Sequence, residues 1–282
     1  MRSLGIDIGG TSVKVALLDG DKVTTSRSSE YSGASADELA TVIAAVLPDG
    51  SNDAQTVGLC VPGRLDPTRT RVVQSINLPA LQKVPLAELI SRAIGARVTP
   101  TIASDAHAAA HDFQVTHKTV GRLLAISIGT GVGASVLDDG KPLLVCGETP
   151  GHFGQIDVTL DAEPVPRTLE SYLGAKRLHA EFGSRLAEAI AAFDIHARPL
   201  RALARSIRIA HAIYRPDTVA LLGYVGMQFA ACQDKLETIV RADLTSVAKP
   251  DWKLAFGSSP FHAAIGAARL AEVNPAARGA GA

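Results

Sequence analysis

The chain has 282 residues, 46% of them hydrophobic, and its 28 Lys and Arg residues balance its 28 Asp and Glu residues. This length suits two domains of ordinary size, and a net charge of zero without a basic tract argues against a nucleic-acid partner. The three cysteines lie far apart, so we expect neither a disulfide framework nor a CxxC metal site. No apolar run is long enough to span a membrane and the first strand follows Met1 almost at once, so we predict a cytoplasmic protein without a signal peptide or a membrane partner.

A strand–turn–strand motif occurs twice in the sequence. Residues 4–22 read LGIDIGGTSVKVALLDGDK, and residues 124–141 read LAISIGTGVGASVLDDGK, which aligns without a gap at an offset of 120 residues. A repeat at this period predicts two homologous domains that each open with a β-hairpin. Glycine lets backbone N–H groups approach an anion closely, so two such turns facing each other across a cleft would suit the phosphates of a nucleotide. Alternatively, the glycines only provide positive φ angles in tight hairpins.

The rest of the chain alternates between strands and helices. In the first half we expect helices at 36–47, 85–94 and 106–117 and strands at 56–61 and 98–103. In the second half we expect helices at 169–182, 185–193, 200–214 and 261–272, a helix that ends near 244, and strands at 218–222 and 252–256. This alternation predicts an α/β protein with domains at 1–118 and 119–282 and a helical insertion at about 169–214.

Polar and charged side chains accompany the first glycine turn. Asp7 ends the first strand, where a carboxylate could hold a Mg²⁺ ion that bridges phosphate oxygens, usually through water. Thr11 could add a hydroxyl group and Lys14 a positive charge. The motif is not a P-loop, because GxxxxGK[ST] does not occur in the chain, and 129–133 is not a Rossmann fingerprint, because a strand follows it.

Two further places carry groups suited to catalysis or sugar binding. Asp105 stands where a strand ends and a helix begins. It is either a helix N-cap or, if Ser104 caps the helix, a carboxylate able to accept a proton from a hydroxyl that attacks a γ-phosphate. His152 lies in a loop, with Glu148 before it and Glu170 after it, and the three could bind the vicinal hydroxyls of a sugar. A lone loop histidine is, however, more often a surface residue.

In order and type, these motifs resemble those of the ROK family (repressors, open reading frames and sugar kinases) in the actin-like ATPase superfamily. The two glycine turns resemble the family's phosphate motifs. The other segments that carry the resemblance are GLCVPG at 58–63, INLP at 76–79, SDAHAAA at 104–110, GH at 151–152, LESYLG at 169–174 and LLGYVG at 221–226. The resemblance implies two actin-like (ribonuclease H-like) domains with a nucleotide cleft between them.

The resemblance also implies roles for individual residues. Asp105 would deprotonate a sugar hydroxyl, Asp7 would serve the Mg²⁺ ion, and ATP would be the phosphoryl donor. The implied sugar contacts are Gly63, Arg64, Asn77, Ser104, Glu148, His152 and Glu170. The implied nucleotide-binding residues are Gly9, Gly10, Thr11, Lys14, Gly129, Thr130, Gly131, Gly223 and Gly226. The resemblance further suggests a homodimer.

The sequence departs from the family pattern at several positions. The family's cysteine-rich zinc segment is missing between His152 and Glu170, so we predict no zinc and expect packing, or Asp157 and Arg167, to hold this loop. Ser104 stands where the family has Asn, and Glu148 lies one place before the expected glutamate position. Both changes leave the usual glucose or N-acetylmannosamine specificity open. No helix-turn-helix precedes the first strand, which argues against the repressor branch.

The resulting prediction is an ATP-dependent, Mg²⁺-requiring kinase that phosphorylates a hydroxyl of a hexose or of an amino or N-acetyl hexose. Two alternatives remain at this point. A kinase using polyphosphate should show a basic track, which the sequence does not show obviously. A non-catalytic sugar or nucleotide sensor would fit the altered sugar loop, but Asp7, Lys14 and Asp105 argue against it. The sugar and the hydroxyl are not determined by the sequence.

Overall fold

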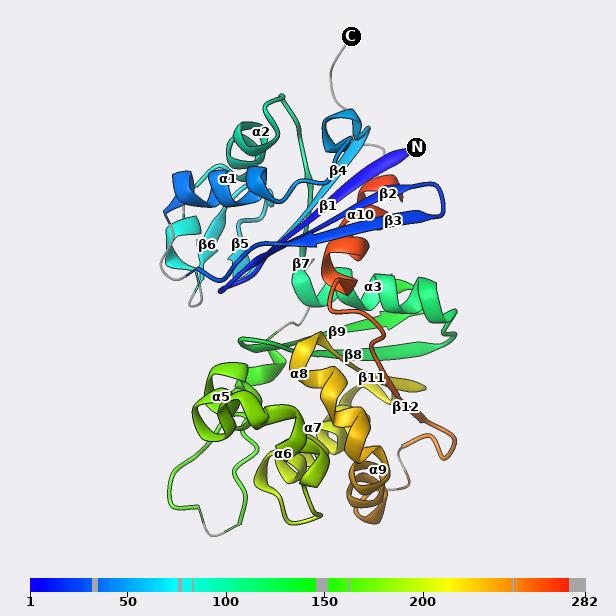
Figure 1. Ribbon diagram of the computed structural model, residues 1–282. Coiled ribbons are helices and arrows are strands. Elements are labelled where there is room, and N and C mark those ends of the chain that lie inside the picture. The colour runs from blue at the N-terminus through cyan, green and yellow to red at the C-terminus, as the bar shows by residue number, and fades with distance from the viewer. Residues whose placement is uncertain are drawn as a thin grey trace. The chain divides into compact units, whose positions relative to one another are not determined.

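The computed structural model describes residues 1–31, 35–75, 78–82, 84–145, 152–161, 163–244, 246 and 248–273. The chain divides into two compact units, each containing a five-stranded sheet (Figure 1). The first unit comprises Met1–Asp112 and the chain from Phe261 onward, and the second comprises Phe113–Pro260. The chain therefore leaves the first unit within one helix and returns to it just before the last helix.

The sheet of the first unit has the strand order β3-β2-β1-β4-β7, in which β1 is antiparallel to β2 and parallel to β4. Its strands are β1 (Arg2–Ile8), β2 (Val13–Asp19), β3 (Lys22–Arg27), β4 (Thr56–Val61) and β7 (Thr101–Ser104), with a small hairpin of β5 (Arg64–Leu65) and β6 (Val72–Gln74). The helices are α1 (Ala36–Ala45), α2 (Leu86–Ile94), α3 (Asp105–His117) and α10 (His262–Val273).

The two faces of this first sheet have different neighbours. Side chains alternate along a strand, and Leu4, Ile6 and Ile8 of β1 belong to one buried cluster with residues of α1 and α2. Gly5 and Asp7 therefore face the other side, where α10 packs (Figure 1). This alternation sets the position of Asp7.

Glycine allows α10 to approach the first sheet closely. A Cβ atom at Gly5 would lie 1.9 Å from the backbone oxygen of Ala264, and one at Gly58 would lie 1.9 Å from that of Ala267. These overlaps leave no room for any larger residue. The predicted division at residue 118 placed this helix in the second domain, whereas its contacts with β1, β2 and β4 group it with the first unit.

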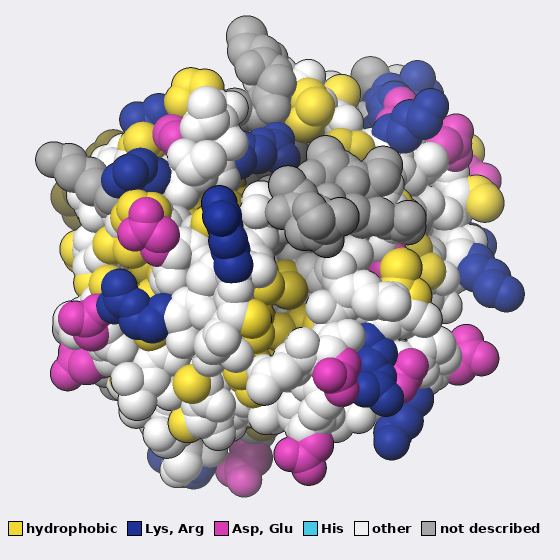
Figure 2. All heavy atoms as spheres, turned by 90° about the horizontal axis from the view of Figure 1, so that it is seen from above, with side chains coloured by type: hydrophobic (Ala, Val, Ile, Leu, Met, Phe, Trp, Pro, Cys, Tyr) yellow, Lys and Arg dark blue, Asp and Glu magenta, His cyan; other side chains and the backbone are white. Residues whose placement is uncertain are grey.

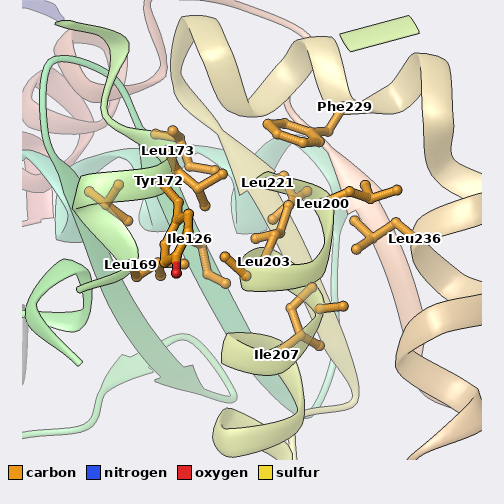
Figure 3. Close-up of a cluster of buried hydrophobic side chains, with 14 of the residues drawn as sticks. Ile126, Leu169, Tyr172, Leu173, Leu200, Leu203, Ile207, Leu221, Phe229 and Leu236 are labelled. Atoms are coloured by element: carbon orange, nitrogen blue, oxygen red, sulfur yellow. The ribbon is translucent and has the colours of Figure 1, made fainter. Parts of the chain in front are cut away.

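The sheet of the second unit has the order β10-β9-β8-β11-β12. Its strands are β8 (Arg122–Ile128), β9 (Val132–Asp138), β10 (Lys141–Pro142), β11 (Thr218–Leu222) and β12 (Lys253–Phe256). Its helices are α4 (Leu169–Leu173), α5 (Ala175–Phe182), α6 (Leu186–Ala192), α7 (Arg198–Tyr214), α8 (Gly223–Gln228) and α9 (Gln233–Ala242). Side chains of α4, α7 and α9 meet those of β8 and β11 in one buried hydrophobic cluster (Figure 3).

The two opening hairpins are related, but one turn is shorter. In the first hairpin Ile8 pairs with Val13, and in the second Ile128 pairs with Val132. The gap-free alignment therefore holds for the first strand of each hairpin and is wrong by one residue in the second strand. At the far end the equivalence is clear, because the Arg2–Asp19 and Arg122–Asp138 ion pairs both span 2.8 Å.

Most predicted elements are present with boundaries shifted by a few residues. The helix expected at 169–182 is instead two helices, α4 and α5, because Gly174 has an extended ψ of 134° between them. No helix among the residues that the structure describes is long and apolar enough to cross a membrane. On the face in Figure 2, the described cationic and anionic side chains are interspersed.

Candidate functional site

A row of polar side chains crosses the first sheet at the end of β1. Lys14 on β2 and Cys60 on β4 are the register partners of Asp7, so the three side chains share one face. Lys14 Nζ lies 3.9 Å from Asp7 Oδ2. Cys60 pairs in turn with Ala103 of β7, and Asp105 follows two residues later at the start of α3. The strand register thus brings Asp7, Lys14 and Asp105 into one site.

The members of this row are close enough to shift one another's pKa values. Burial raises the pKa of Asp7 to about 6, the nearby Lys14 lowers it, and Asp105 raises it. Burial also raises the pKa of the Cys60 thiol well above its usual value, and Asp7 and Asp105 raise it further. Cys60 Sγ lies 3.6 Å from the oxygen of Ala263, so the protonated thiol can donate to it. The site carries excess negative charge beside Lys14.

Ser104 caps α3, as the sequence allowed, and Asp105 is left at the edge of the sheet. Ser104 Oγ accepts a hydrogen bond of 3.3 Å from the backbone N–H of His107. Asp105 Oδ1 accepts one of 2.8 Å from Ala106 N–H, and the residue remains exposed. Desolvation by neighbouring protein atoms raises the pKa of Asp105, while the Ala106 amide and Lys14 lower it. Water around the exposed part of the residue reduces the size of these effects.

The first glycine turn is held by hydrogen bonds from a distant tyrosine. The backbone N–H of Gly9 donates to Ser12 O over 3.0 Å, and Tyr31 Oη donates to Gly9 O over 2.6 Å. The backbone N–H of Tyr31 donates to Thr11 O over 2.9 Å. Burial and Asp7 raise the pKa of Tyr31, so its hydroxyl stays protonated. Gly9 does not adopt a left-handed φ, so the interpretation that this glycine only supplies a positive φ is wrong.

The second glycine turn is held by α4 and α5. The backbone N–H of Val132 donates to Glu170 Oε2 over 2.8 Å, and that of Ala175 donates to Gly129 O over 2.8 Å. Within the turn, Gly129 N–H donates to Gly131 O over 2.9 Å. Among the described residues, a Cβ atom at Gly129 would meet nothing within 4 Å, and this glycine also lacks a left-handed φ. The described part of the chain therefore leaves space beside Gly129.

Two more of the implied nucleotide-binding residues, Gly223 and Gly226, lie beside this second turn. Gly223 has φ +78° at the start of α8, and a Cβ atom there would lie 2.5 Å from Ile128 O. Gly226 packs one turn later, where a Cβ atom would lie 3.6 Å from that of Ile128. The second unit thus brings residues 129–131 together with Gly223, Gly226 and Glu170.

The remaining predicted sugar contacts are spread over both units. Gly63 follows β4 with φ +112°, and Arg64 begins β5 as an exposed residue. His152 is exposed and precedes a 3-10 turn at 153–155 in the second unit. Asn77 and Glu148 lie outside the described residues.

Comparison with known proteins identifies the family. The sequence model of the ROK family matches residues 3–273, which is nearly the whole chain. The chain belongs to the ROK family.

The chain is similar to two sugar kinases and to a transcriptional regulator. N-acetylmannosamine kinase of Salmonella typhimurium is 30% identical over 158 residues, which cover 55% of this chain and 53% of that protein. The chain therefore spans about half the length of this relative. A glucokinase from Streptomyces griseus, solved with glucose and AMPPNP, has a TM-score of 0.76 at 17% identity, covering 97% of this chain and 100% of that one. A ROK transcriptional regulator, a homologue of the E. coli MLC protein, has a TM-score of 0.73 at 17% identity, covering 96% and 77%. The predicted family and its actin-like α/β fold are confirmed.

The segment between His152 and Glu170, where the sequence lacks the family's zinc-binding cysteines, is held together by backbone pairing. Asp157 bridges to Thr168, Val158 N–H donates to Arg167 O over 3.0 Å, and Leu169 N–H donates to the oxygen of Ile156 over 3.1 Å. Within the described ranges, no group of three His, Cys, Asp or Glu residues is arranged to hold a metal ion. The absence of zinc stays a prediction.

Proposed function

We propose that this ROK protein is an ATP-dependent sugar kinase that phosphorylates a hydroxyl of a hexose or of an amino or N-acetyl hexose. The observation that carries the proposal is the site formed by Asp7, Lys14 and Asp105 within the first unit. Phosphoryl transfer needs a base for the attacking hydroxyl and positive charge beside the phosphates, and this site offers both. The similarity to an N-acetylmannosamine kinase and to a glucokinase supports a sugar as the acceptor.

Asp105 is the proposed general base. It is exposed at the edge of the sheet, so a substrate hydroxyl can reach its carboxylate. Its raised pKa makes it a better proton acceptor than an ordinary aspartate. Lys14, whose Nζ lies 3.9 Å from Asp7, places a positive charge beside the phosphates that the first turn would bind.

Asp7 is the residue proposed to serve Mg²⁺. The residue is 7% exposed, and burial raises the pKa of its carboxylate to about 6, with Asp105 adding to the negative charge. A buried carboxylate with this excess of negative charge fits a cation, held directly or through water. When bound, the ion would neutralise charge on the phosphate oxygens.

The nucleotide contacts are proposed from the two glycine turns and α8. In the first unit these are Gly9, Gly10, Thr11 and Lys14, and in the second they are Gly129, Thr130, Gly131, Gly223 and Gly226. The proposed sugar contacts are Gly63, Arg64, Asn77, Ser104, Glu148, His152 and Glu170. A cytoplasmic location and a homodimer stay predictions.

A sensor without turnover is the second candidate. The MLC homologue with the same fold is a transcriptional regulator, and Ser104 and the altered loop before His152 depart from the kinase pattern. Both candidates would bind a sugar, but only the kinase would release ADP.

Product formation with a panel of sugars separates these candidates. Purified protein with Mg²⁺ and ATP, or with polyphosphate, is incubated with hexoses, amino sugars and N-acetyl sugars, and ADP and sugar phosphate are measured. Sugar-dependent formation of both products with ATP supports the proposal and names the substrate. Sugar binding by calorimetry without turnover from either donor would favour the sensor, and turnover with polyphosphate alone would overturn ATP as the donor.

A further inference from the structure

Glu170 contacts the second glycine turn directly. Its Oε2 accepts a 2.8 Å hydrogen bond from the backbone N–H of Val132, the first residue of β9 after the turn. A carboxylate acceptor makes such a bond charge-assisted and stronger than one between neutral groups. The residue that resemblance marks as a sugar contact is therefore also a support of the turn proposed to bind phosphate.

The helix that carries Glu170 is firmly anchored. Leu169, Tyr172 and Leu173 of α4 point into the buried cluster beside Ile126 of β8 (Figure 3). Their burial fixes the helix against the same strand that leads into the glycine turn. Glu170, on the same short helix, is thereby held at the turn.

Two glycines let the neighbouring segments pack against the same turn. A Cβ atom at Gly154 would lie 2.3 Å from the backbone oxygen of Val132 and 3.2 Å from Glu170 Oε2. One at Gly174 would lie 3.2 Å from the backbone oxygen of Thr130. The next residue, Ala175, donates its N–H to Gly129 O over 2.8 Å. Gly154, Gly174 and Ala175 thus pack against the same turn that Glu170 contacts.

We propose that Glu170 is a positioning residue for the phosphate turn of the second unit, which it holds in its nucleotide-binding conformation through Val132. Val132 uses one carboxylate oxygen, and a sugar could use the other. This inference rests on the proposed function, because it assumes that the turn binds nucleotide. In addition to any contact with sugar, Glu170 would then increase the affinity for nucleotide even when no sugar is bound.

Substitutions at Glu170 separate positioning from sugar contact. Glu170→Gln keeps an oxygen that can accept from Val132, whereas Glu170→Ala removes the acceptor. Without sugar, we expect Glu170→Ala to bind Mg-AMPPNP about tenfold more weakly than the wild type, and Glu170→Gln to remain within about threefold of it. Glu181→Ala, at an exposed glutamate of α5 that pairs with Arg177, is the matched control and should bind as the wild type does.

Two measurements read out the effect. Calorimetry gives the Kd for Mg-AMPPNP, and hydrogen–deuterium exchange without ligand reports on the amide of Val132, which should exchange faster in Glu170→Ala but not in Glu170→Gln. If Glu170→Ala does not fold, the test compares the wild type with Glu170→Gln. Slow exchange of the Val132 amide in both proteins supports the proposal, and fast exchange of this amide in the wild type overturns it.

The outcomes also separate this inference from the proposed function. Wild-type nucleotide affinity in Glu170→Ala, with a change only in the KM for sugar, would overturn the positioning role and leave the kinase intact. Failure of the wild type to bind Mg-AMPPNP would overturn the proposed function and this inference with it.

Discussion

The two glycine turns are built on related hairpins but carry different side chains. In the first unit the register pair behind the turn is Asp7 with Lys14, and in the second it is Ser127 with Gly133. Both turns offer backbone N–H groups, but of the two register pairs only the one in the first hairpin consists of ionisable side chains. Under the proposed function, both copies of the backbone would bind phosphate, while the charge-dependent chemistry would belong to one copy.

The supports of the two turns also differ. In the first unit a neutral hydroxyl, that of Tyr31, donates to the turn carbonyl of Gly9. In the second unit a carboxylate, that of Glu170, accepts from the amide of Val132. The two turns are therefore expected to respond differently to substitution.

The largest expected effect follows from the register pair itself. Asp7→Asn should lower kcat/KM for sugar phosphorylation about a thousandfold, because the carboxylate proposed to serve the cation is lost. The equivalent change in the other hairpin, Ser127→Ala, should alter kcat/KM by no more than about twofold. Steady-state ADP release measures both. Equal losses at the two positions would break the proposed division of roles.

The second effect concerns Gly5, which lies two residues before Asp7 on β1. Gly5→Ala should lower the free energy of unfolding by about 3 kcal/mol, because the new Cβ would lie 1.9 Å from the backbone oxygen of Ala264. Its counterpart on β8, the buried Ala125, already has a side chain, and Ala125→Gly should cost only about 1 kcal/mol. Urea unfolding provides the comparison. A smaller loss at Gly5 than at Ala125 would show that α10 can move away from the sheet.

A third effect concerns stability and pH. The folded protein raises the pKa of Asp7 from 3.8 to about 6, so its ionised form destabilises the fold, by an amount that grows as pH rises between these values and is constant above them. Two pKa units correspond to about 3 kcal/mol, a net figure that already includes the attraction to Lys14. Without Mg²⁺, Asp7→Asn should therefore be up to about 3 kcal/mol more stable than the wild type at pH 7 and show little gain at pH 4.

Thermal unfolding across this pH range tests the sign. Ser127→Ala serves as the control and should show no gain that develops with pH. A stability gain for Asp7→Asn that was larger at pH 4 than at pH 7 would contradict the burial of an ionised Asp7.

The smallest expected effect is at the support of the first turn. Tyr31→Phe removes only the hydroxyl that donates to Gly9 O, so Mg-AMPPNP should bind about fivefold more weakly. Tyr214→Phe, at the end of α7 in the second unit, is the matched control and should leave the Kd unchanged. An unchanged Kd for Tyr31→Phe would mean that the turn keeps its shape without this bond.

Local sequence patterns were sufficient to predict part of the site. Asp7 and Lys14 could be placed together because a hairpin brings the two ends of its turn into register. N-cap preferences left Ser104 and Asp105 as alternatives for the cap of α3, and the structure places Ser104 there. The ROK family and its fold followed from ordered motifs.

Other features depend on contacts between residues far apart in sequence. Tyr31 reaches Gly9, and Glu170 reaches Val132, without any local pattern that marks these pairs. The membership of α10 in the first unit depends on the fit of small residues across the chain, such as Gly5 against Ala264. A gap-free alignment also concealed that the second turn is shorter by one residue.

The most direct test of the central claim is the rate of sugar-dependent ADP release by Asp105→Asn. Asp105 lies in the first unit beside Asp7, and removing a general base should lower kcat by about 10²–10⁴-fold while sugar and nucleotide still bind. Asp21→Asn, at an exposed aspartate in the β2–β3 turn, should retain the wild-type rate. A kcat for Asp105→Asn equal to that of the wild type would contradict the assignment of the base to the first unit.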